Sequence, residues 1–311
     1  MGKVITLTMP IKKRYSKLQA PQRRFAYLAL IIPMAVLITF VIVPTILAGY
    51  YSLNDFNMIK PPQFVGLSNF VELFSDPIFQ AALRNTIVYM VACVAAQLVV
   101  GLGLAIIVTR EWLLGRTFFR TIYFLPVVIS MVAVSIIWQW IFDSRVGLIN
   151  LALGFIGIAP QPWLSSASQA LLVIIIISVW KFSGYNVVIF TAAIQNISKD
   201  YYEAAAVDGS NGWTDFWFIT LPLISPTLLF AIITSAIGSF QVFDSVYVIT
   251  QGMGGPNFST MTLLVYLYKH AFDGMRFGYG SAVSIVMFGI LMILTLVQLR
   301  IGRSSSEAMN F

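Results

Sequence analysis

Few residues of this chain have side chains that could act as a nucleophile, a general base or a metal ligand. The sequence contains one histidine, His270, and one cysteine, Cys93. Asp273 follows His270 closely, but catalysis needs a cluster of titratable groups, and metal sites need several ligands at fixed spacing. The phosphate-binding pattern G-x-x-x-x-G-K-[ST] occurs nowhere, so the chain does not hydrolyse ATP by that route. We expect no catalytic residue, no metal site and no bound cofactor.

A second set of chemically useful residues lies inside long apolar segments, where polar side chains are costly and usually face a cavity. Lys181 and Tyr185 are four residues apart and therefore share one face of a helix. The candidates for lining a substrate path are Trp180, Lys181, Tyr185, Asn186, Gln241 and Asp244, and Gln97 is a further polar residue of this kind. The alternative is hydrogen bonding between helices, worth about 0.6 kcal/mol per pair, and for Lys181 a structural role.

The composition places these residues in a membrane. Apolar residues make up 59% of the chain and charged residues 10%, whereas soluble domains carry about 25% charged residues. A helix needs about 20 apolar residues to cross the hydrocarbon core. Because lipid offers no hydrogen-bond partners, such segments must be helical, which predicts an all-α integral membrane protein with six transmembrane helices. The six segments are Phe25–Tyr50, Thr86–Thr109, Phe118–Ile141, Gln169–Gln195, Leu223–Phe243 and Tyr279–Leu299.

The basic residues indicate how these helices are oriented. Most Lys and Arg residues fall in the N-terminal segment 1–24 and in the loops on the same side of the membrane, as in cytoplasmic segments. We therefore expect a cytoplasmic N-terminal segment 1–24, a membrane domain 25–300 and a cytoplasmic tail 301–311. The apolar run after residue 24 is too long for a signal peptide, so the first span stays attached. The net charge of +7 reflects this topology and does not predict nucleic-acid binding.

A polar loop, residues 196–222, separates the fourth and fifth predicted spans on the cytoplasmic side. Ser198 is a good N-cap, and Tyr201–Asp208 favours a helix that Gly209 can end in the left-handed conformation. Ser210 is predicted to cap a second short helix, which Pro222 must stop or connect to the fifth span. The alanines after Glu203 give a flat surface suited to close approach by another protein. The residues predicted to make or shape this contact are Glu203, Ala204, Ala205, Asp208, Gly209, Ile219, Leu221 and Pro222.

The spacing of these residues resembles the EAA loop of permease subunits of bacterial ABC importers. An ordinary amphipathic loop on the membrane, the alternative, would not need Glu-Ala-Ala, Gly and Leu-Pro at these separations. The chain lacks the extra N-terminal spans and large outer insertion of the founding maltose-type subunit and is similar to the shorter six-span members. Other stretches resemble the carbohydrate-uptake branch of that family: Phe64–Phe70, Asn85-Thr86, Leu125-Pro126, Trp180-Lys181, and Gly254-Gly255-Pro256 followed by Thr262.

The resemblance implies an ABC type I importer permease fold and a non-catalytic transport subunit in a bacterial or archaeal cell membrane. It implies that the first helix of the loop is a coupling helix that sits in a cleft of an ATPase subunit, with ATP and Mg bound by that ATPase. The implied partners are a second homologous permease, two copies of the ATPase, an extracytoplasmic sugar-binding protein and membrane lipid, with no nucleic acid.

The cargo implied by the resemblance is a sugar, either an oligosaccharide or a disaccharide. Sugars are bound by planar polar groups and aromatic faces, which fits Trp180, Tyr185, Asn186 and Gln241. The alternative is glycerol-3-phosphate or a related polyol compound, but a phosphate predicts arginine deep within a span, where the sequence has Lys181 instead. An ion-coupled secondary transporter, the other alternative, should show inverted repeats, and none is visible in the sequence.

Overall fold

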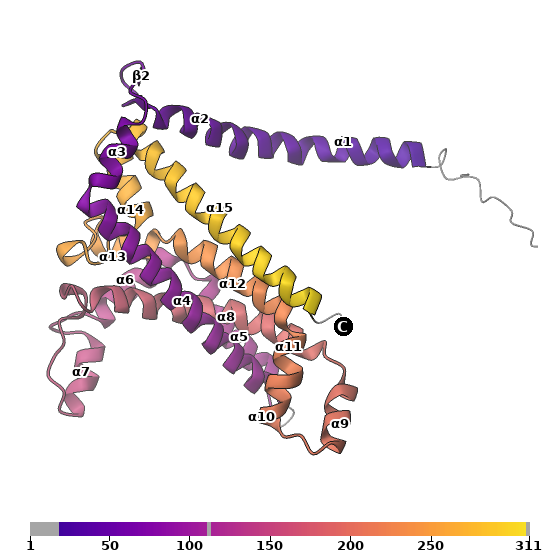
Figure 1. Ribbon diagram of the computed structural model, residues 1–311. Coiled ribbons are helices and arrows are strands. Elements are labelled where there is room, and N and C mark those ends of the chain that lie inside the picture. Colours follow the sequence, from indigo (N-terminus) through magenta and orange to yellow (C-terminus); the bar gives the residue numbers. More distant parts are fainter. Residues whose placement is uncertain (1–18, 111–112, 309–311) are drawn as a thin grey trace, which may run out of the picture. The chain divides into compact units, whose positions relative to one another are not determined.

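The computed structural model describes residues 19–110 and 113–308, and its contacts divide the chain into two units, residues 1–50 and 51–311 (Figure 1). Strands in the described residues are limited to a short ribbon, in which β1 (Asn54–Asp55) pairs antiparallel with β2 (Gln63–Phe64). Most of the other described residues are helical. The prediction of an all-α protein is confirmed.

The first unit contains an apolar helical rod. The rod consists of α1 (Gln19–Leu37), a π-helical turn η1 (Ile38–Ile42) and α2 (Val43–Ser52), whose last two residues belong to the second unit. Its stretch Tyr27–Ser52 is long and apolar enough to cross a membrane, and its large apolar side chains are exposed on all sides. A helix that is apolar all round needs lipid or another protein around it. This rod corresponds to the first predicted span.

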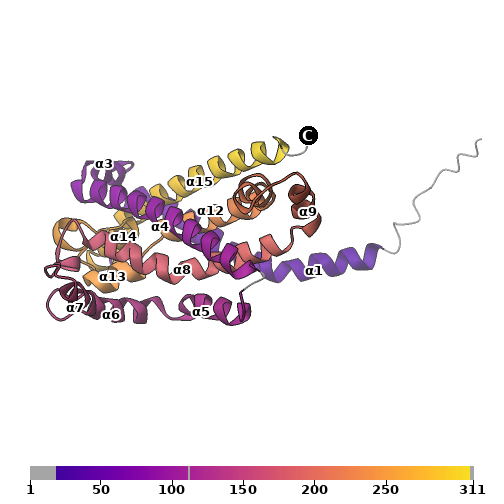
Figure 2. The ribbon, with the colours of Figure 1, turned by 90° about the horizontal axis from the view of Figure 1, so that it is seen from below.

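The second unit is a helical bundle built around α4 and α8, which run side by side, with α12 packed against both and α15 along α12 (Figures 1 and 2). Gly101 lets α4 approach α8, because a Cβ at Gly101 would lie 2.5 Å from the Cβ of Asn186. Small residues at such contacts allow membrane helices to pack closely. The helices of the bundle are α4 (Pro77–Thr109), α8 (Ala170–Gln195), α12 (Ser225–Phe240), α13 (Asp244–Thr250) and α15 (Phe277–Ala308).

The third predicted span requires a correction. The sequence predicts one continuous helix over Phe118–Ile141, but the structure divides it into α5 (Arg116–Val128) and α6 (Met131–Ile141), which are bent by 96°. Ile129 and Ser130 have extended backbones at the break. Pro126, one turn earlier, has no backbone N–H to donate to the helix.

The bent pair and five long helices together make six candidate spans among the described residues. The five are Tyr27–Ser52, Pro77–Thr109, Ala170–Gln195, Ser225–Thr250 and Phe277–Gly302. The six-helix architecture predicted from the sequence is thus confirmed, with the fifth span reaching Thr250 rather than Phe243.

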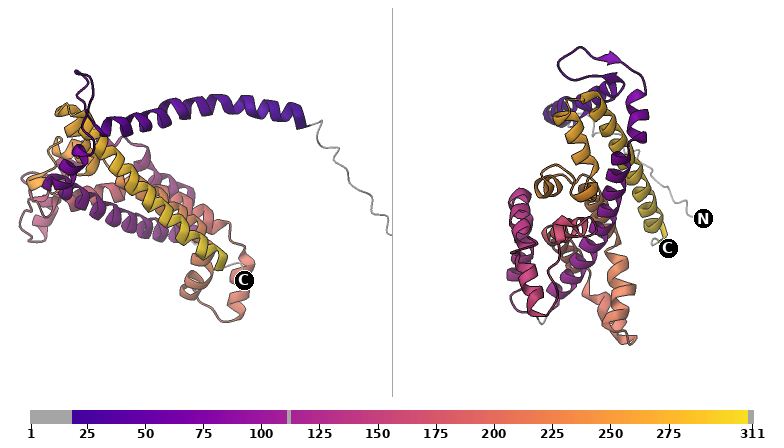
Figure 3. Two further views of the ribbon diagram at one scale, coloured as in Figure 1. Left: turned by 45° about the horizontal axis from the view of Figure 1, so that its top comes forward. Right: turned by 90° about the vertical axis from the view of Figure 1, so that its left-hand side faces the viewer.

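The short elements of the second unit collect at two opposite ends of the bundle (Figures 2 and 3). The α9 end holds the connection from α8 to α12, which contains α9 (Lys199–Val207), α10 (Gly212–Asp215), η3 (Phe216–Thr220) and α11 (Leu221–Leu223). The opposite end, called the ribbon end below, holds the β ribbon, α3 (Ser68–Ser75), α7 (Leu148–Phe155), η2 (Trp163–Ser165), η4 (Pro256–Phe258), α14 (Leu263–Tyr268) and η5 (Lys269–Asp273).

Asn85 and Thr86 connect α4 to the loop before α14. The side-chain amide of Asn85 donates to the carbonyl oxygens of Phe258 (2.8 Å) and Met261 (3.1 Å). The backbone N–H of Leu263 donates to the Thr86 hydroxyl at 2.9 Å. The loop is rich in left-handed conformations, at Gln251, Gly252, Gly254, Gly255, Asn257 and Phe258. Glycine adopts such conformations without strain, and the Asn-Thr pair holds the resulting irregular backbone against the bundle.

A polar network joins α3, α14 and α15 at the ribbon end. The Tyr266 hydroxyl donates to an Asp76 carboxylate oxygen at 2.5 Å and lies 2.7 Å from the Tyr279 hydroxyl. Arg276 donates to both carboxylate oxygens of Glu72, at 2.7 and 2.6 Å. These bonds hold the pKa of Glu72 below its ordinary value. Because the Arg276–Glu72 pair is about half exposed, it contributes about 0–1 kcal/mol to stability.

His270 packs inside this network. Its ring centre lies 4.3 Å from that of Tyr266 and 5.1 Å from that of Tyr279. Burial lowers the pKa of His270, and the nearby cations Arg276 and Lys269 act in the same direction, while Asp76 and Glu72 oppose them. The folded protein therefore favours the neutral imidazole.

We predict that mild acid destabilises the ribbon end through His270. In the unfolded chain His270 binds a proton near the ordinary histidine pKa of about 6.5, whereas in the folded chain protonation requires a lower pH. The contribution of neutral His270 to the free energy of unfolding is therefore fully present above that pH and is lost as the pH falls below it. The thermal unfolding midpoint in detergent should fall between pH 7 and pH 5, and it should fall less in His270→Gln. Equal pH dependence in the two proteins would show that His270 does not carry the effect.

Candidate functional site

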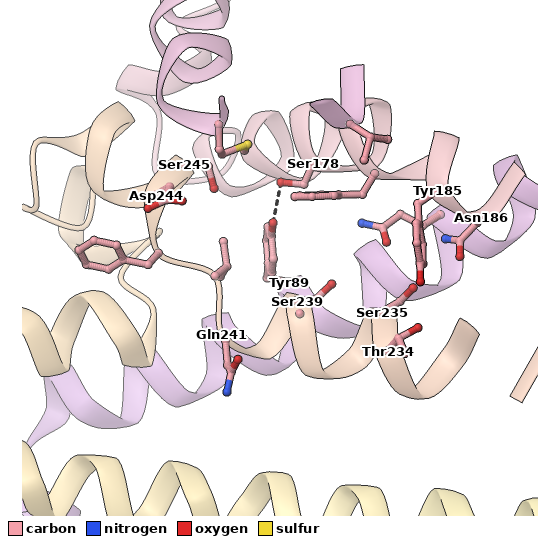
Figure 4. Close-up of a pocket in the computed structure, with 17 residues that line it drawn as sticks. Tyr89, Ser178, Tyr185, Asn186, Thr234, Ser235, Ser239, Gln241, Asp244 and Ser245 are labelled. Carbon is pink, nitrogen blue, oxygen red and sulfur yellow. Dashed lines mark hydrogen bonds between the residues drawn. The ribbon is translucent and has the colours of Figure 1, made fainter. Parts of the chain in front are cut away.

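A cavity of 430 Å³ lies within the bundle (Figure 4). It is bounded by two interruptions of the helices. One is the α5–α6 break, and the other is the segment Gln241–Phe243 between α12 and α13. The residues that line the cavity are Tyr89, Gln97, Val127, Met131, Ser178, Phe182, Tyr185, Asn186, Thr234, Ser235, Gly238, Ser239, Gln241, Val242, Phe243, Asp244 and Ser245. Its volume is in the range of small-molecule sites.

The polar lining of the cavity consists mainly of hydroxyl and amide groups. Tyr89 donates from its hydroxyl to Ser178 at 2.6 Å, which joins α4 to α8 beside the cavity. The amide oxygen of Asn186 and the hydroxyl of Ser245 are buried and have no hydrogen-bond partner in the described part of the chain. Buried polar atoms normally have partners, so these two oxygens are exceptions among the residues that line the cavity. Asp244 is the one charged residue among the lining residues.

The cavity brings together most of the residues predicted to line a substrate path. Tyr185, Asn186, Gln241, Asp244 and Gln97 line it, although they come from different helices. Tyr185 and Phe182 of α8, with Phe243, supply aromatic rings to the wall. Such a wall offers rings for stacking and hydrogen-bond donors and acceptors for a polar ligand.

Two predicted residues, Trp180 and Lys181, lie outside the lining. The Trp180 ring packs edge-on against Trp138 of α6, with centres 5.5 Å apart. The Lys181 ammonium donates to carbonyl oxygens at the α5–α6 break. On α8 the lining residues Ser178, Phe182 and Tyr185 form one stripe at helical spacing, and position 180 lies on the other side of the helix. Lys181 lies on the same side as Tyr185, as predicted, but its ammonium is directed to the α5–α6 break.

The sequence reasoning missed the small hydroxyl residues of the lining. Thr234, Ser235 and Ser239 recur at helical spacing on α12, with Gly238 beside them. This spacing was a usable signal, but Ser and Thr in membrane helices commonly bond to their own backbone. Thr234 does so here, donating to the carbonyl of Phe230 at 2.9 Å. The sequence alone could not separate these two uses.

At the α9 end the loop 196–222 folds largely as the sequence predicts. The backbone N–H of Asp200 donates to the Ser198 hydroxyl at 3.3 Å, which confirms the N-cap. Gly209 has φ +79°, which confirms the left-handed turn after α9. The N–H of Gly209 donates to Ala206 and that of Ser210 to Ala205, the pair of bonds that closes a Schellman motif.

The start of the second short helix requires a correction. Asn211, not Ser210, is the N-cap of α10, and it forms a capping box with Thr214. Ser210 is unsuited to that position because its backbone N–H completes the end of α9, and its hydroxyl donates to Asp215 at 2.6 Å.

The residues of the loop divide into an exposed set and a supporting set. Glu203, Ala204, Asp208 and Gly209 are exposed on α9 and the turn, and Ala205 is partly covered. Ile219, Leu221 and Pro222 are partly buried in the segment that leads into α12. The Tyr202 hydroxyl lies 2.9 Å from that of Thr220 and ties the two sets together. The exposed set places two carboxylates, those of Glu203 and Asp208, beside small residues on the surface of the α9 end.

Residues 97–306, more than half of the chain, match the family described as binding-protein-dependent transport system inner membrane component. The chain belongs to this family of importer permeases. The matched residues include all the cavity-lining residues except Tyr89, and the whole of loop 196–222. The chain is therefore a multi-pass permease subunit of a binding-protein-dependent importer, with a transport role rather than a catalytic one.

Individual relatives agree with this family. The permease is 41% identical to the lactose transport system permease protein LacF of Rhizobium radiobacter, over 78% of its own length and 82% of that protein. It is 32% identical to the trehalose/maltose transport system permease protein MalF of Thermococcus litoralis, over 93% and 97% of the two chains. A bacterial alginate ABC transporter, crystallised with an alginate pentasaccharide-bound periplasmic protein, has the same fold, with a TM-score of 0.79 at 23% identity over 94% and 98% of the chains.

We predict that Gly209→Val weakens binding of the permease to its ATPase partner. A β-branched residue at positive φ costs about 1–3 kcal/mol, and no atom lies within 4 Å of a Cβ at this position, so the effect comes from the backbone alone. The variant should bind its ATPase partner more weakly in a pull-down from detergent. Gly209→Asn, whose side chain tolerates the left-handed region, should retain binding. Equal binding by the two variants would contradict the turn assignment.

Proposed function

We propose that this permease forms half of the translocation pathway for a neutral disaccharide or oligosaccharide. It pairs with a second, homologous permease, with two copies of an ABC ATPase on the cytoplasmic side and a sugar-binding protein outside. ATP and Mg bind to the ATPase subunits and not to this chain. Support comes from the family description, which names dependence on a binding protein, and from relatives named for lactose and for trehalose or maltose.

The observation that carries the choice of cargo is the chemistry of the cavity wall. A sugar presents many hydroxyl groups, each able to donate and to accept. The wall offers matching hydroxyls and amides, from residues such as Ser239 and Gln241, and aromatic rings such as Tyr185. Asp244 can accept hydrogen bonds from sugar hydroxyls, and charge-assisted bonds of this kind are strong.

Glycerol-3-phosphate or a related polyol compound is the second candidate. Phosphate groups are usually held by Arg, Lys or the N-terminus of a helix. The lining contains no Lys, Arg or His, and its one charged residue, Asp244, repels an anion. This favours a neutral cargo. The family match, in turn, favours a binding-protein-dependent importer over an ion-coupled secondary transporter.

The orientation belongs to the same proposal. With the α9 end in the cytoplasm, the N-terminal segment 1–24 and the tail 301–311 are cytoplasmic as well, in a bacterial or archaeal cell membrane. The distribution of basic residues supports this topology. Residues 1–18 and 309–311, which include most of the N-terminal segment, lie outside the described residues.

In this arrangement α9 is the coupling helix. Ala204 and Ala205 allow close contact with a cleft of the ATPase, and Glu203 and Asp208 supply charge beside it. Movement of α9 reaches the membrane through the Tyr202–Thr220 contact and the short α11, which leads directly into α12. Because α12 carries one wall of the cavity, ATPase closure and cargo access are mechanically linked.

We predict that Glu203→Lys lowers uptake at least about tenfold, since reversing a charge at a protein contact costs several kcal/mol. The variant should insert normally, because Glu203 is exposed. Uptake is measured in liposomes containing the complete transporter, binding protein and ATP. The matched control is Asp273→Lys, the same charge change at the exposed ribbon end. Near-normal uptake by Glu203→Lys would overturn the coupling assignment.

We predict that Tyr185→Ala and Gln241→Ala impair transport of sugars without abolishing ATP hydrolysis. Both residues line the cavity, and loss of a ring or an amide removes about 1–3 kcal/mol of ligand contact. The measurements are uptake rates for a panel of labelled sugars and polyol phosphates, with ATPase activity recorded in parallel. Gln63→Ala, an exposed glutamine in β2, is the control. Unchanged uptake in both cavity variants would argue against the cavity as the path.

A further inference from the structure

Lys181 is a charged residue in the interior of a membrane helix, and it is not part of the cavity. It lies on α8 and is 3% exposed. Its ammonium group donates to the carbonyl oxygens of Pro126 (2.9 Å), Val127 (3.3 Å) and Ile129. All three acceptors are main-chain atoms, and all three lie at the end of α5 or in the break that follows it.

The break explains why these acceptors need a donor. Carbonyl groups in the last turn of a helix have no N–H four residues ahead to accept from. Within a membrane, water does not replace the missing partners, and irregular backbone is tolerated where protein groups satisfy it. An ammonium has three N–H donors and no acceptor. The three donors of Lys181 match the three carbonyl oxygens in number.

Two neighbouring residues of α8, Gly184 and Phe182, favour the contact between Lys181 and the α5–α6 break. Gly184, one turn along α8 from Lys181, lets α5 approach very closely, because a Cβ at Gly184 would lie 1.9 Å from the carbonyl oxygen of Tyr123. A bulkier residue at that position would push α5 away and carry the three carbonyls out of reach. The Lys181 ammonium also lies 5.4 Å from the centre of the Phe182 ring, which lines the cavity.

The break itself shapes the cavity. Val127 lies just before it and Met131 just after it, and both line the wall. If the third span were one straight helix, these two side chains could not keep their present positions. The contacts of Lys181 with the backbone of Pro126, Val127 and Ile129 therefore fix a part of the wall, although Lys181 itself does not line the cavity.

We propose that Lys181 is a positioning residue for transport: it holds the broken third span against α8 and thereby sets the cavity wall formed by Val127 and Met131. This proposal rests on the proposed function in treating the cavity as the translocation path. It assigns to Lys181 no contact with cargo. The role is instead to satisfy the backbone that a non-helical joint exposes in the membrane.

The test measures the position of the wall without depending on transport. Cys93, the one cysteine in the sequence, is replaced in Cys93→Ala, and a single thiol is introduced by Val127→Cys or, on the opposite helix α12, by Ser235→Cys. Each protein is assembled with its partner subunits in liposomes and labelled with a water-soluble maleimide. The labelling rates are compared between the protein that retains Lys181 and the Lys181→Met variant. Lys60→Met, at an exposed position, is the control for loss of a positive charge.

We expect Lys181→Met to change the labelling rate at position 127 by at least about tenfold, because loss of hydrogen bonds from a charged donor shifts a local equilibrium by this factor or more. The rate at position 235 should change much less, and Lys60→Met should change neither. Lys181→Arg, which keeps the charge and the donors, should restore a rate closer to that of the unmodified protein. Equal rates at position 127 in Lys181 and Lys181→Met would overturn the proposal.

A second readout separates this proposal from the proposed function. Protection of the position-127 thiol by cargo-loaded binding protein and ATP tests whether the cavity is the path. If Lys181→Met changes the labelling rate but cargo gives no protection, Lys181 is a positioning residue and the cavity is not the translocation path. If cargo gives protection but Lys181→Met leaves the rate unchanged, the cavity is the path and Lys181 is not a positioning residue. If Lys181→Met does not reach the membrane, Lys181→Gln, which loses the charge and one of the three N–H donors, is measured in its place. The rate at position 127 should again change, and an unchanged rate would overturn the proposal.

Discussion

The need to satisfy every backbone N–H and C=O group within a membrane governs this structure. Helices meet that need by themselves, and the bundle of α4, α8, α12 and α15 follows from it. A permease must also enclose a space for cargo, and the cavity lies where two spans are interrupted, at Ile129–Ser130 and at Gln241–Phe243. Each departure from helix needs a partner group from elsewhere. At the first interruption that group is the ammonium of Lys181.

The same principle operates at both ends of the bundle with different groups. At the ribbon end, the side chains of Asn85 and Thr86 bond the irregular backbone around Phe258 and Leu263. At the α9 end, where water can reach the backbone, the loop uses local devices instead: the Ser198 cap, the Gly209 turn and the Asn211 capping box. The buried departures thus depend on contacts distant in sequence, and the exposed ones on nearby residues.

This difference explains which features the sequence could predict. The spans were readable from apolar length, and most of the α9 loop from caps and glycine, because those signals are local. The break in Phe118–Ile141 cannot be predicted in this way, because Pro126 is compatible with a kinked or a straight span. The donor that stabilises the break, Lys181, is far away in sequence. Tyr185, Asn186, Gln241 and Asp244 stood out as polar residues in apolar runs. The serines and threonines of α12 did not, because their hydroxyls can bond their own helix.

The contacts of Lys181 with main-chain atoms have a consequence for how such permeases can diversify. The ammonium recognises carbonyl oxygens, which every amino acid supplies, and not the side chains of Val127 or Ile129. A substitution at Val127, which lines the cavity, can alter the shape and polarity of the wall while the hydrogen bonds of Lys181 to the backbone remain intact. The side chains that shape the cavity wall are therefore distinct from the atoms that hold the break in place, so the wall can change by single replacements without loss of the scaffold.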